Sequence, residues 1–344
     1  MVLNERRIIL VIGCDCDPLG FVASSKQGRP ENWERTVRTL KVLMTRLQPV
    51  LPQEQVPKVT FLIRSDTYMQ EAFGEYAYCA RVSHDFFDEM RSEGHEIGWH
   101  PHLWRWSGKW VAELKDSEFI KDCLVNGFNS LNDYFRLLSV RTGWDFMSNE
   151  IMGTFESLGL QADFSALPGM KYQETKRGVG YDWLGAPTRF YFPSRTDYRR
   201  PAVGARFRVL EMPITLIESP RLVSWVRSFI DWRCGAKRST TRYEAFNIAK
   251  HPLFNRHGFE KALGSGQVEH PRYILSYFHP GDVANSALFS MKYLEANIRD
   301  LWIRCRKEKS EVVAMTAKQA AEHFLKLHGN SLQTPGHSDL KWFI

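Results

Sequence analysis

The stretch IILVIGCDCDP, from Ile8 to Pro18, decides how the rest of the chain is interpreted. Its five leading apolar residues are too few for a membrane span or a secretory apolar segment, and they are typical of a buried strand. Residues two apart in an extended segment face the same side, so Asp15 and Asp17 are predicted to point together from the end of this strand. The alternative is that both carboxylates cap a turn before Pro18.

Beyond this stretch, β-rich apolar runs alternate with amphipathic helical patterns, which predicts a mainly parallel sheet with helices around it. About seven or eight such units predict an α/β fold, a distorted or incomplete (β/α) barrel of about seven parallel strands. We expect one domain over 1–328, a Pro/Gly/aromatic-rich insertion at 166–204 over the C-terminal face, and an extension at 329–344. The predicted strands are 8–14, 59–63, 96–100, 139–141, 161–165, 207–212, 273–278 and 311–315. The predicted helices are 31–47, 85–93, 117–138, 149–158, 292–306 and 317–327, with further helices within 220–263.

The composition is that of a globular protein, with 43% hydrophobic and 25% charged residues among 344. The net charge of +7 is spread along the chain without a nucleic-acid module, so no nucleic-acid partner is expected. An ordinary basic surface explains the charge as well as an anionic substrate or a membrane-surface glycolipid does. The six cysteines show no disulfide framework and no transmembrane segment is present, which together predict a cytoplasmic protein. The oligomeric state leaves no signal in the sequence.

Polar side chains able to do chemistry follow the predicted strands at their downstream ends. In parallel barrels the active site lies at the carboxyl ends of the strands, so this distribution predicts an active site there. The residues concerned are Asp15, Asp17, His100, His102, Arg141, Asp163 and His279.

The segment GHEIGWHPHLWRW, 94–106, brings three histidines close together. Strand parity places His100 and His102 on one face and His95 on the other. Two imidazoles and one carboxylate form a three-ligand set that leaves positions for water or substrate, as in catalytic zinc sites. The alternative for His102 is a packed or stacking histidine.

Five segments in chain order carry a stronger signal than any one of them alone. They are VIGCDCDP at 11–18, GHEIGWH at 94–100, RTGW at 141–144 with LG at 158–159, DFS at 163–165, and LSYFHP at 275–280. Together they resemble the motifs of the NodB-homology family of metal-dependent polysaccharide deacetylases. The segments YDWLGAP at 181–187 and FPS at 192–194 resemble the branch associated with bacterial O-antigen and other surface polysaccharides.

The resemblance implies a role for each strand-end residue. It makes Asp15 the general base, Arg141 the group that keeps this base ionised, and His279 the general acid, and it adds Asp163 to the catalytic set. It makes Asp17, His100 and a further histidine the metal ligands. The expected cofactor is a divalent metal, zinc first, with cobalt, nickel, iron and manganese as alternatives.

Two departures from the family pattern affect the metal site. The usual adjacent aspartates are here separated by Cys16, and Trp104 stands where the family has its second metal histidine. Either His102 takes over as the third ligand, which is our prediction, or the metal site is degraded.

The implied activity is removal of an N-acyl group, acetyl or formyl, from a sugar of a bacterial surface polysaccharide that is anionic or lipid-linked. The aromatic residues expected to contact the sugar are Trp104, Trp144, Trp183 and Tyr191. Two alternatives stay open: hydrolysis of a small amide or cyclic ureide, and saccharide binding without catalysis.

Overall fold

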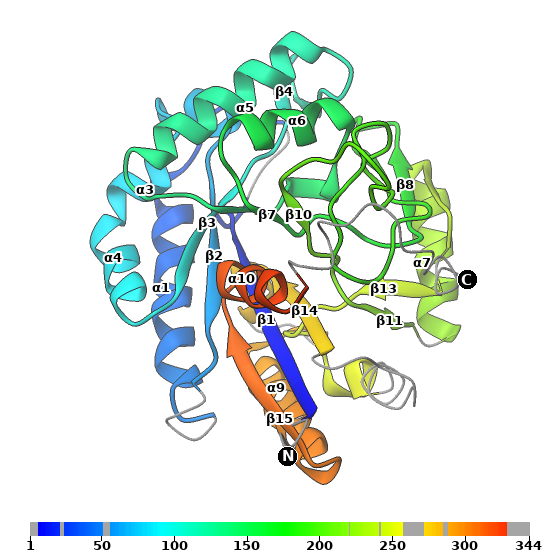
Figure 1. Cartoon of the computed structure of the whole chain (residues 1–344). Helices are drawn as coiled ribbons and strands as arrows, with labels where there is room; N and C mark the ends of the chain where they lie inside the picture. The colour runs from blue at the N-terminus through cyan, green and yellow to red at the C-terminus, as the bar shows by residue number, and fades with distance from the viewer. Residues whose placement is uncertain are drawn as a thin grey trace.

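The computed structural model describes residues 6–20, 24–50, 56–219, 221–240, 242–256, 272–284 and 288–328. These residues form a curled parallel sheet that is wrapped by helices (Figure 1). The predicted extension at 329–344 lies outside the described residues. In the described part of the chain, no helix is long and apolar enough to cross a membrane.

The main sheet has seven strands in the order β10-β7-β6-β3-β2-β1-β14, and β15 lies beside the first half of β1. All pairings in it are parallel, and the backbone N–H of Thr215 donates to the Leu275 carbonyl (3.1 Å) across the gap between the two edge strands. The predicted incomplete (β/α) barrel is therefore confirmed. The strands are β1 (Arg6–Cys16), β2 (Val59–Arg64), β3 (Glu96–His100), β6 (Ser139–Val140), β7 (Ala162–Asp163), β10 (Leu210–Glu211), β14 (Arg272–Phe278) and β15 (Ser310–Met315).

Most helices cover the outside of the main sheet, whereas α10 lies at one end of its concave side and the helix at 221–234 packs against the short strand at 236–238 (Figure 1). Helix α5 ends at Asn132, before the predicted end at 138, because the Asn132 side chain accepts a hydrogen bond from Leu137 N (3.0 Å) and so stabilises a turn. The helices are α1 (Pro30–Leu47), α2 (Thr67–Phe73), α3 (Tyr78–Val82), α4 (His84–Ser92), α5 (Ser117–Asn132), α6 (Asn149–Ser157), α7 (Arg221–Cys234), α9 (Met291–Lys307) and α10 (Ala317–His328).

Strand β1 is buried on both faces and sorts its side chains between two cores. Ile8 and the alternate residues after it pack under the outer helices, whereas Ile9 and Val11 pack inside the barrel with the alanines of α10. Burial of each such side chain stabilises the fold by roughly 1.5–3 kcal/mol. Because Asp15 continues the Ile9–Val11 series, its carboxylate is directed into the barrel.

The region after β7 carries short antiparallel strands that build a wall over the carboxyl ends of the barrel. The prediction of helices within 220–263 is confirmed by α7 and by a helical segment at 252–256, and β12 and β13 lie between these two; residues 220, 241 and 257–263 are outside the described part. Strands of three residues are too short to show an alternating pattern in the sequence. These strands pair as β8 (Lys171–Glu174) with β9 (Gly180–Asp182) and β12 (Ala236–Arg238), and as β11 (Leu216–Glu218) with β13 (Tyr243–Ala245). A further antiparallel pair, β4 (Trp104–Trp106) with β5 (Trp110–Ala112), comes before β7 in the chain.

Candidate active site

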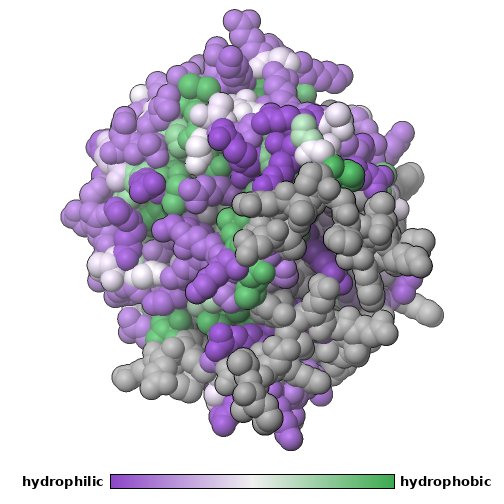
Figure 2. Space-filling model, in the orientation of Figure 1, coloured by the Kyte–Doolittle hydropathy of each residue, from purple (hydrophilic) through white to green (hydrophobic). Residues whose placement is uncertain are grey.

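A cavity of about 520 Å³ opens at the carboxyl ends of β1, β2, β3 and β14. The coloured residues on the face drawn in Figure 2 are mainly hydrophilic, with small groups of apolar residues between them. The cavity brings together charged side chains, several of which are buried. Its charged and imidazole-bearing walls include Asp15, Asp17, Arg64, His100, His102, Arg141, Asp145 and His279.

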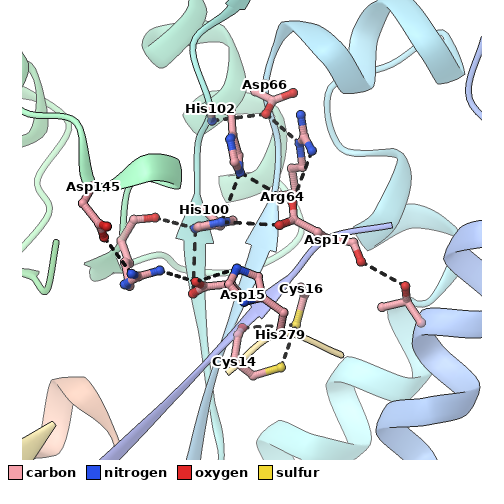
Figure 3. Close-up of polar contacts among 12 residues, drawn as sticks. Cys14, Asp15, Cys16, Asp17, Arg64, Asp66, His100, His102, Asp145 and His279 are labelled. Atoms are coloured by element: carbon pink, nitrogen blue, oxygen red, sulfur yellow. Dashed lines mark hydrogen bonds and ion pairs between the residues drawn. The ribbon is translucent and has the colours of Figure 1, made fainter. Parts of the chain in front are cut away.

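Asp17, His100 and His102 form a cluster whose donor atoms all lie within 4.8 Å of one another (Figure 3). The two histidine Nε2 atoms are 3.2 Å apart, and carboxylate oxygens of Asp17 lie 3.6 Å from His102 Nε2 and 3.8 Å from His100 Nε2. Tetrahedral zinc with bonds of about 2.0–2.1 Å separates its ligand atoms by roughly 3.3 Å. The cluster therefore fits a divalent metal, and it contains the two co-facial histidines that strand parity predicted.

The protonation states also suit metal binding. His100 Nδ1 lies 2.7 Å from the Arg141 carbonyl oxygen, which only accepts, so Nδ1 donates and the Nε2 lone pair faces the cluster. Burial and the Arg64 charge lower the pKa of His102 to about 4, which keeps its ring neutral. Burial opposes ionisation of Asp17. The interactions with His102, with the Arg64 guanidinium and with His100 outweigh burial and hold the pKa of Asp17 well below its usual range.

His102 is in close contact with two neighbours. The indole of Trp104 is buried and stacks on the His102 ring, with centroids 6.0 Å apart and an interplanar angle of 13°. The backbone of Gly143 also lies against this ring, since a Cβ atom at Gly143 would come within 2.2–2.3 Å of three His102 ring atoms. Trp104 thus supports the histidine that stands two residues before it.

Asp15 lies between Arg141 and His279. Arg141 forms an ion pair with Asp15 and a second one with Asp145 Oδ1 (2.6 Å), and its guanidinium carbon lies 4.1 Å from the centroid of the Tyr277 ring. Asp15 is fully buried, and Oδ2 is 3.5 Å from His279 Nε2. Asp15 is therefore a buried carboxylate paired with a buried guanidinium.

The backbone of the loop after Arg141 is strained at the residues around Asp145, the second partner of Arg141. Trp144 and Asp145 have φ angles of 59° and 52°, a left-handed conformation that costs about 1–3 kcal/mol for a residue other than glycine. The indole N–H of Trp183 donates to the Asp145 carbonyl (2.9 Å) and stabilises this conformation.

An equivalent arrangement holds Asp17, and the sequence analysis did not identify it. Arg64 Nη1 lies 3.3 Å from Asp17 Oδ1, and Arg64 Nε donates to Asp66 Oδ2 at 2.8 Å. Asp66 also accepts from His102 N (3.1 Å) and from Met69 N, where it caps α2. Arg64 and Asp66 follow the second strand, so the strand-end rule applied to every strand would have found them.

His279 is oriented by a chain of hydrogen bonds that ends outside the barrel strands. Asp282 Oδ2 lies 3.4 Å from His279 Nδ1 and accepts from the Asn247 side-chain amide at 2.7 Å. Burial disfavours the imidazolium, but Asp282 and the Asp15 charge outweigh burial and raise the pKa of His279 to about 9. The ring is therefore protonated at neutral pH.

The predicted catalytic residue Asp163 does not line the cavity. It is fully buried at the end of β7, accepts from Ser165 Oγ (2.6 Å), and pairs in register with Glu211 of β10. Burial raises the pKa of Asp163 to about 6 and that of Glu211 well above its usual range. Asp163 is therefore not placed to contact a molecule in the cavity, contrary to the catalytic role that the sequence analysis expected.

The four predicted sugar-contacting aromatics separate into two pairs. Trp144, 36% exposed, and Trp104 line the cavity, although the Trp104 ring is engaged by His102. Trp183 and Tyr191 are buried outside the cavity, so the prediction that they contact the sugar is wrong. Their polar groups are used internally, since the Tyr191 hydroxyl donates to the Tyr198 carbonyl (3.1 Å).

Two tyrosines that the sequence analysis missed complete the aromatic wall. Tyr172 and Tyr181 pair across β8 and β9 and stack with centroids 5.8 Å apart, and Arg238 of β12 lies over Tyr172 at 4.7 Å. Beside them, Arg177 lies 4.5 Å from the Trp144 ring. Aromatic and guanidinium planes of this kind suit the faces of sugar rings.

Comparisons with known proteins find similar folds among solved structures only. No family model and no curated protein matches the chain. Among solved structures, a provisionally assigned glycoside hydrolase/deacetylase from Parabacteroides distasonis aligns with 94% of this chain and 72% of its own at 12% identity, with a TM-score of 0.54. A provisionally assigned polysaccharide deacetylase from Mycobacterium smegmatis aligns with 99% of this chain and 97% of its own at 13% identity and a TM-score of 0.45. Another, involved in O-antigen biosynthesis in Bordetella bronchiseptica, aligns over 92% and 90% at 10% identity and a TM-score of 0.34. The similarity to the first of these structures confirms, at the level of the fold, the resemblance to deacetylases that the sequence motifs indicated.

Proposed function

We propose that this chain is a metal-dependent hydrolase that removes an N-acyl group, acetyl or formyl, from a sugar of a bacterial surface polysaccharide. The observation that carries the proposal is the pairing of two sites in one cavity. The Asp17/His100/His102 cluster fits a metal, and the Asp15–Arg141 pair lies beside it with the protonated His279 3.5 Å from Asp15. A carboxylate base and a charged acid next to a metal site are the groups that amide hydrolysis requires.

The residues divide the reaction between them. A divalent metal held by Asp17, His100 and His102 would polarise the acyl oxygen and acidify the attacking water. Asp15, paired with Arg141, accepts a proton from the water as the water oxygen adds to the acyl carbon. His279 donates its proton to the sugar nitrogen as the C–N bond breaks, which gives a carboxylic acid and a free amine.

The finer features of the proposal rest on chemistry as well. One carboxylate and two imidazoles favour zinc, with cobalt, nickel, iron or manganese as alternatives. The aromatic wall supports a saccharide substrate, and the net charge of +7 supports one that is anionic or lipid-linked. Five described cysteines are free and buried, which supports action in the cytoplasm.

The test combines metal analysis with product detection. Purified protein is expected to contain one equivalent of divalent metal and to release acetate or formate from N-acylated saccharides, such as N-acetylglucosamine oligomers, but not from a cyclic ureide. Chelation should abolish release, and added zinc should restore it. Protein that binds no metal but binds saccharides would instead be a non-catalytic binding protein, and ureide turnover would identify a small-amide hydrolase.

The raised pKa of His279 predicts how the activity depends on pH. Because the imidazolium form is the acid, kcat/KM should fall as pH rises through about 9. Asp282→Asn removes the charge that favours the imidazolium, so the basic limb should move toward the ordinary histidine value of about 6.5. Asp300→Asn, which breaks an ion pair with Arg304 on α9, is the matched control and should leave the profile unchanged. An unshifted limb in Asp282→Asn would remove His279 from the acid role.

A further inference from the structure

Arg64 is the second buried guanidinium at the cavity, and nothing in the proposed reaction uses it. Its side chain is 3% exposed, it lines the cavity, and it comes from the end of β2, next to the strand that carries Asp17. Figure 3 shows it on the Asp17 side of the cluster, across from Asp15 and Asp145. A buried cation is costly unless it is paired, and pairing with Asp66 and Asp17 compensates for the burial of Arg64.

The contacts of Arg64 show which partner anchors it. The Nε–Asp66 distance of 2.8 Å is that of a strong charge-assisted hydrogen bond, and the guanidinium carbon lies 4.4 Å from the Tyr68 ring centroid. The Nη1–Asp17 distance of 3.3 Å is longer than the 2.7–2.9 Å usual for such pairs. Asp66 and Tyr68 therefore fix the guanidinium plane, and Nη1 is engaged only loosely with Asp17.

The metal cluster beside Arg64 lacks the histidine that the family motif places at position 104. Position 104 carries a tryptophan, which has no lone pair to offer, and its ring packs against His102 instead. Arg64 places a permanent positive charge near the same cluster, since Asp17 Oδ1 lies 3.3 Å from Nη1 and 3.6 Å from His102 Nε2. A fixed charge this close repels a bound cation but attracts negative charge that develops on a substrate beside it.

We propose that Arg64 is a further catalytic residue, which donates a hydrogen bond from its guanidinium to the acyl oxygen as that oxygen becomes negatively charged. The inference rests on the proposed N-deacylation. No proton is transferred by Arg64: the water oxygen adds to the acyl carbon, the carbonyl electron pair moves to the acyl oxygen, and the guanidinium stabilises that charge until the C–N bond breaks. Asp66 acts as the positioning residue for this donor.

The competing explanation is that Arg64 only orients the metal ligand Asp17, and two measurements on one variant separate the two roles. Arg64→Gln is expected to lower kcat for acetate release by about 10²- to 10³-fold, as loss of a transition-state donor does. Its zinc affinity, measured by competition with a chromophoric chelator, should equal or exceed that of the wild type, because a repelling charge has been removed. Arg64→Lys, which keeps the charge but not the planar fork, should fall between the two in kcat.

Arg105→Gln is the matched control. Arg105 is also paired with two carboxylates, Glu113 (3.4 Å) and Asp116 (2.7 Å), and lies over Phe119 at 4.2 Å, but it does not line the cavity. This variant should keep both kcat and zinc affinity.

Because Arg64→Gln leaves Asp66 buried without its cation, the double variant Arg64→Gln/Asp66→Asn provides a version in which both charges are removed. Thermal unfolding of each variant reports whether it folds. Zinc affinity that falls tenfold or more in the folded variants would show that Arg64 orients Asp17. An unchanged kcat, or a rise in KM alone, would show that Arg64 does not act in the transition state. A wild-type protein that binds zinc and releases no acid would refute the deacylation and this role together.

Discussion

Asp15→Asn is expected to abolish most acid release, with kcat lowered by about 10²- to 10⁴-fold, while the protein keeps its metal. The amide cannot accept the proton of the attacking water, yet Asp15 lies outside the cluster that fits the metal. Arg141 retains its pair with Asp145 at 2.6 Å, so the loop after β6 should stay in place. The measurements are single-turnover acetate release and metal content of the same preparation.

Asp17→Asn is the variant with which Asp15→Asn is compared, to separate loss of the base from loss of the metal. The two aspartates are two residues apart on one strand end, but only Asp17 has oxygens within 3.8 Å of both histidines. Asp17→Asn should therefore lose metal as well as activity. If metal instead leaves with Asp15→Asn and stays with Asp17→Asn, the two roles are exchanged.

Gly143→Ala is expected to disable the metal cluster without altering any ligand. The added Cβ would overlap the His102 ring at 2.2–2.3 Å, and the ring is buried and packed against Trp104, which limits how far it can move. The backbone of Gly143 is itself fixed, since its N–H donates to the Pro101 carbonyl at 2.8 Å. We expect zinc affinity to fall by about 10- to 100-fold and the free energy of unfolding to fall by about 1–3 kcal/mol.

Gly153→Ala on α6 is the matched control for this variant. A Cβ there would meet only Phe207, at 3.7 Å, and alanine is the better helix former, so stability should be unchanged or higher by up to about 1 kcal/mol. Zinc titration and chemical denaturation of both variants provide the test. A Gly143→Ala protein with wild-type zinc affinity would show that His102 is not a ligand.

The cavity is built from two similar units, each with an arginine between two aspartates. Arg141 joins Asp15 to Asp145, and Arg64 joins Asp17 to Asp66, so each carboxylate at the end of β1 has its own buried cation. The first unit serves the proposed base and the second serves the proposed metal ligand. The separate partners explain how two aspartates at the end of the same strand can have different roles, one as the proposed base and one as the proposed metal ligand.

Strand patterns in the sequence determined the barrel and one edge of the site. Alternation along β1 and β3 is a local property with a period of two residues, so it predicted that His100 and His102 share one face and that Asp15 and Asp17 share another. The family resemblance added Asp17 as the carboxylate of the three-residue cluster that the structure contains. Parallel strands then bring their carboxyl ends to one edge, which placed Arg141 and His279 beside them.

Only the tertiary structure decided what surrounds these residues. The clash that requires glycine at 143, the anchoring of Arg64 by Asp66, and the burial of Trp183 and Tyr191 arise between segments that are brought together by folding. The wall formed by β8, β9 and β12 joins segments more than fifty residues apart in the chain. Sequence periodicity reports which side of its own element a residue faces, whereas burial, ion pairing and protonation depend on which distant side chains fill the space opposite.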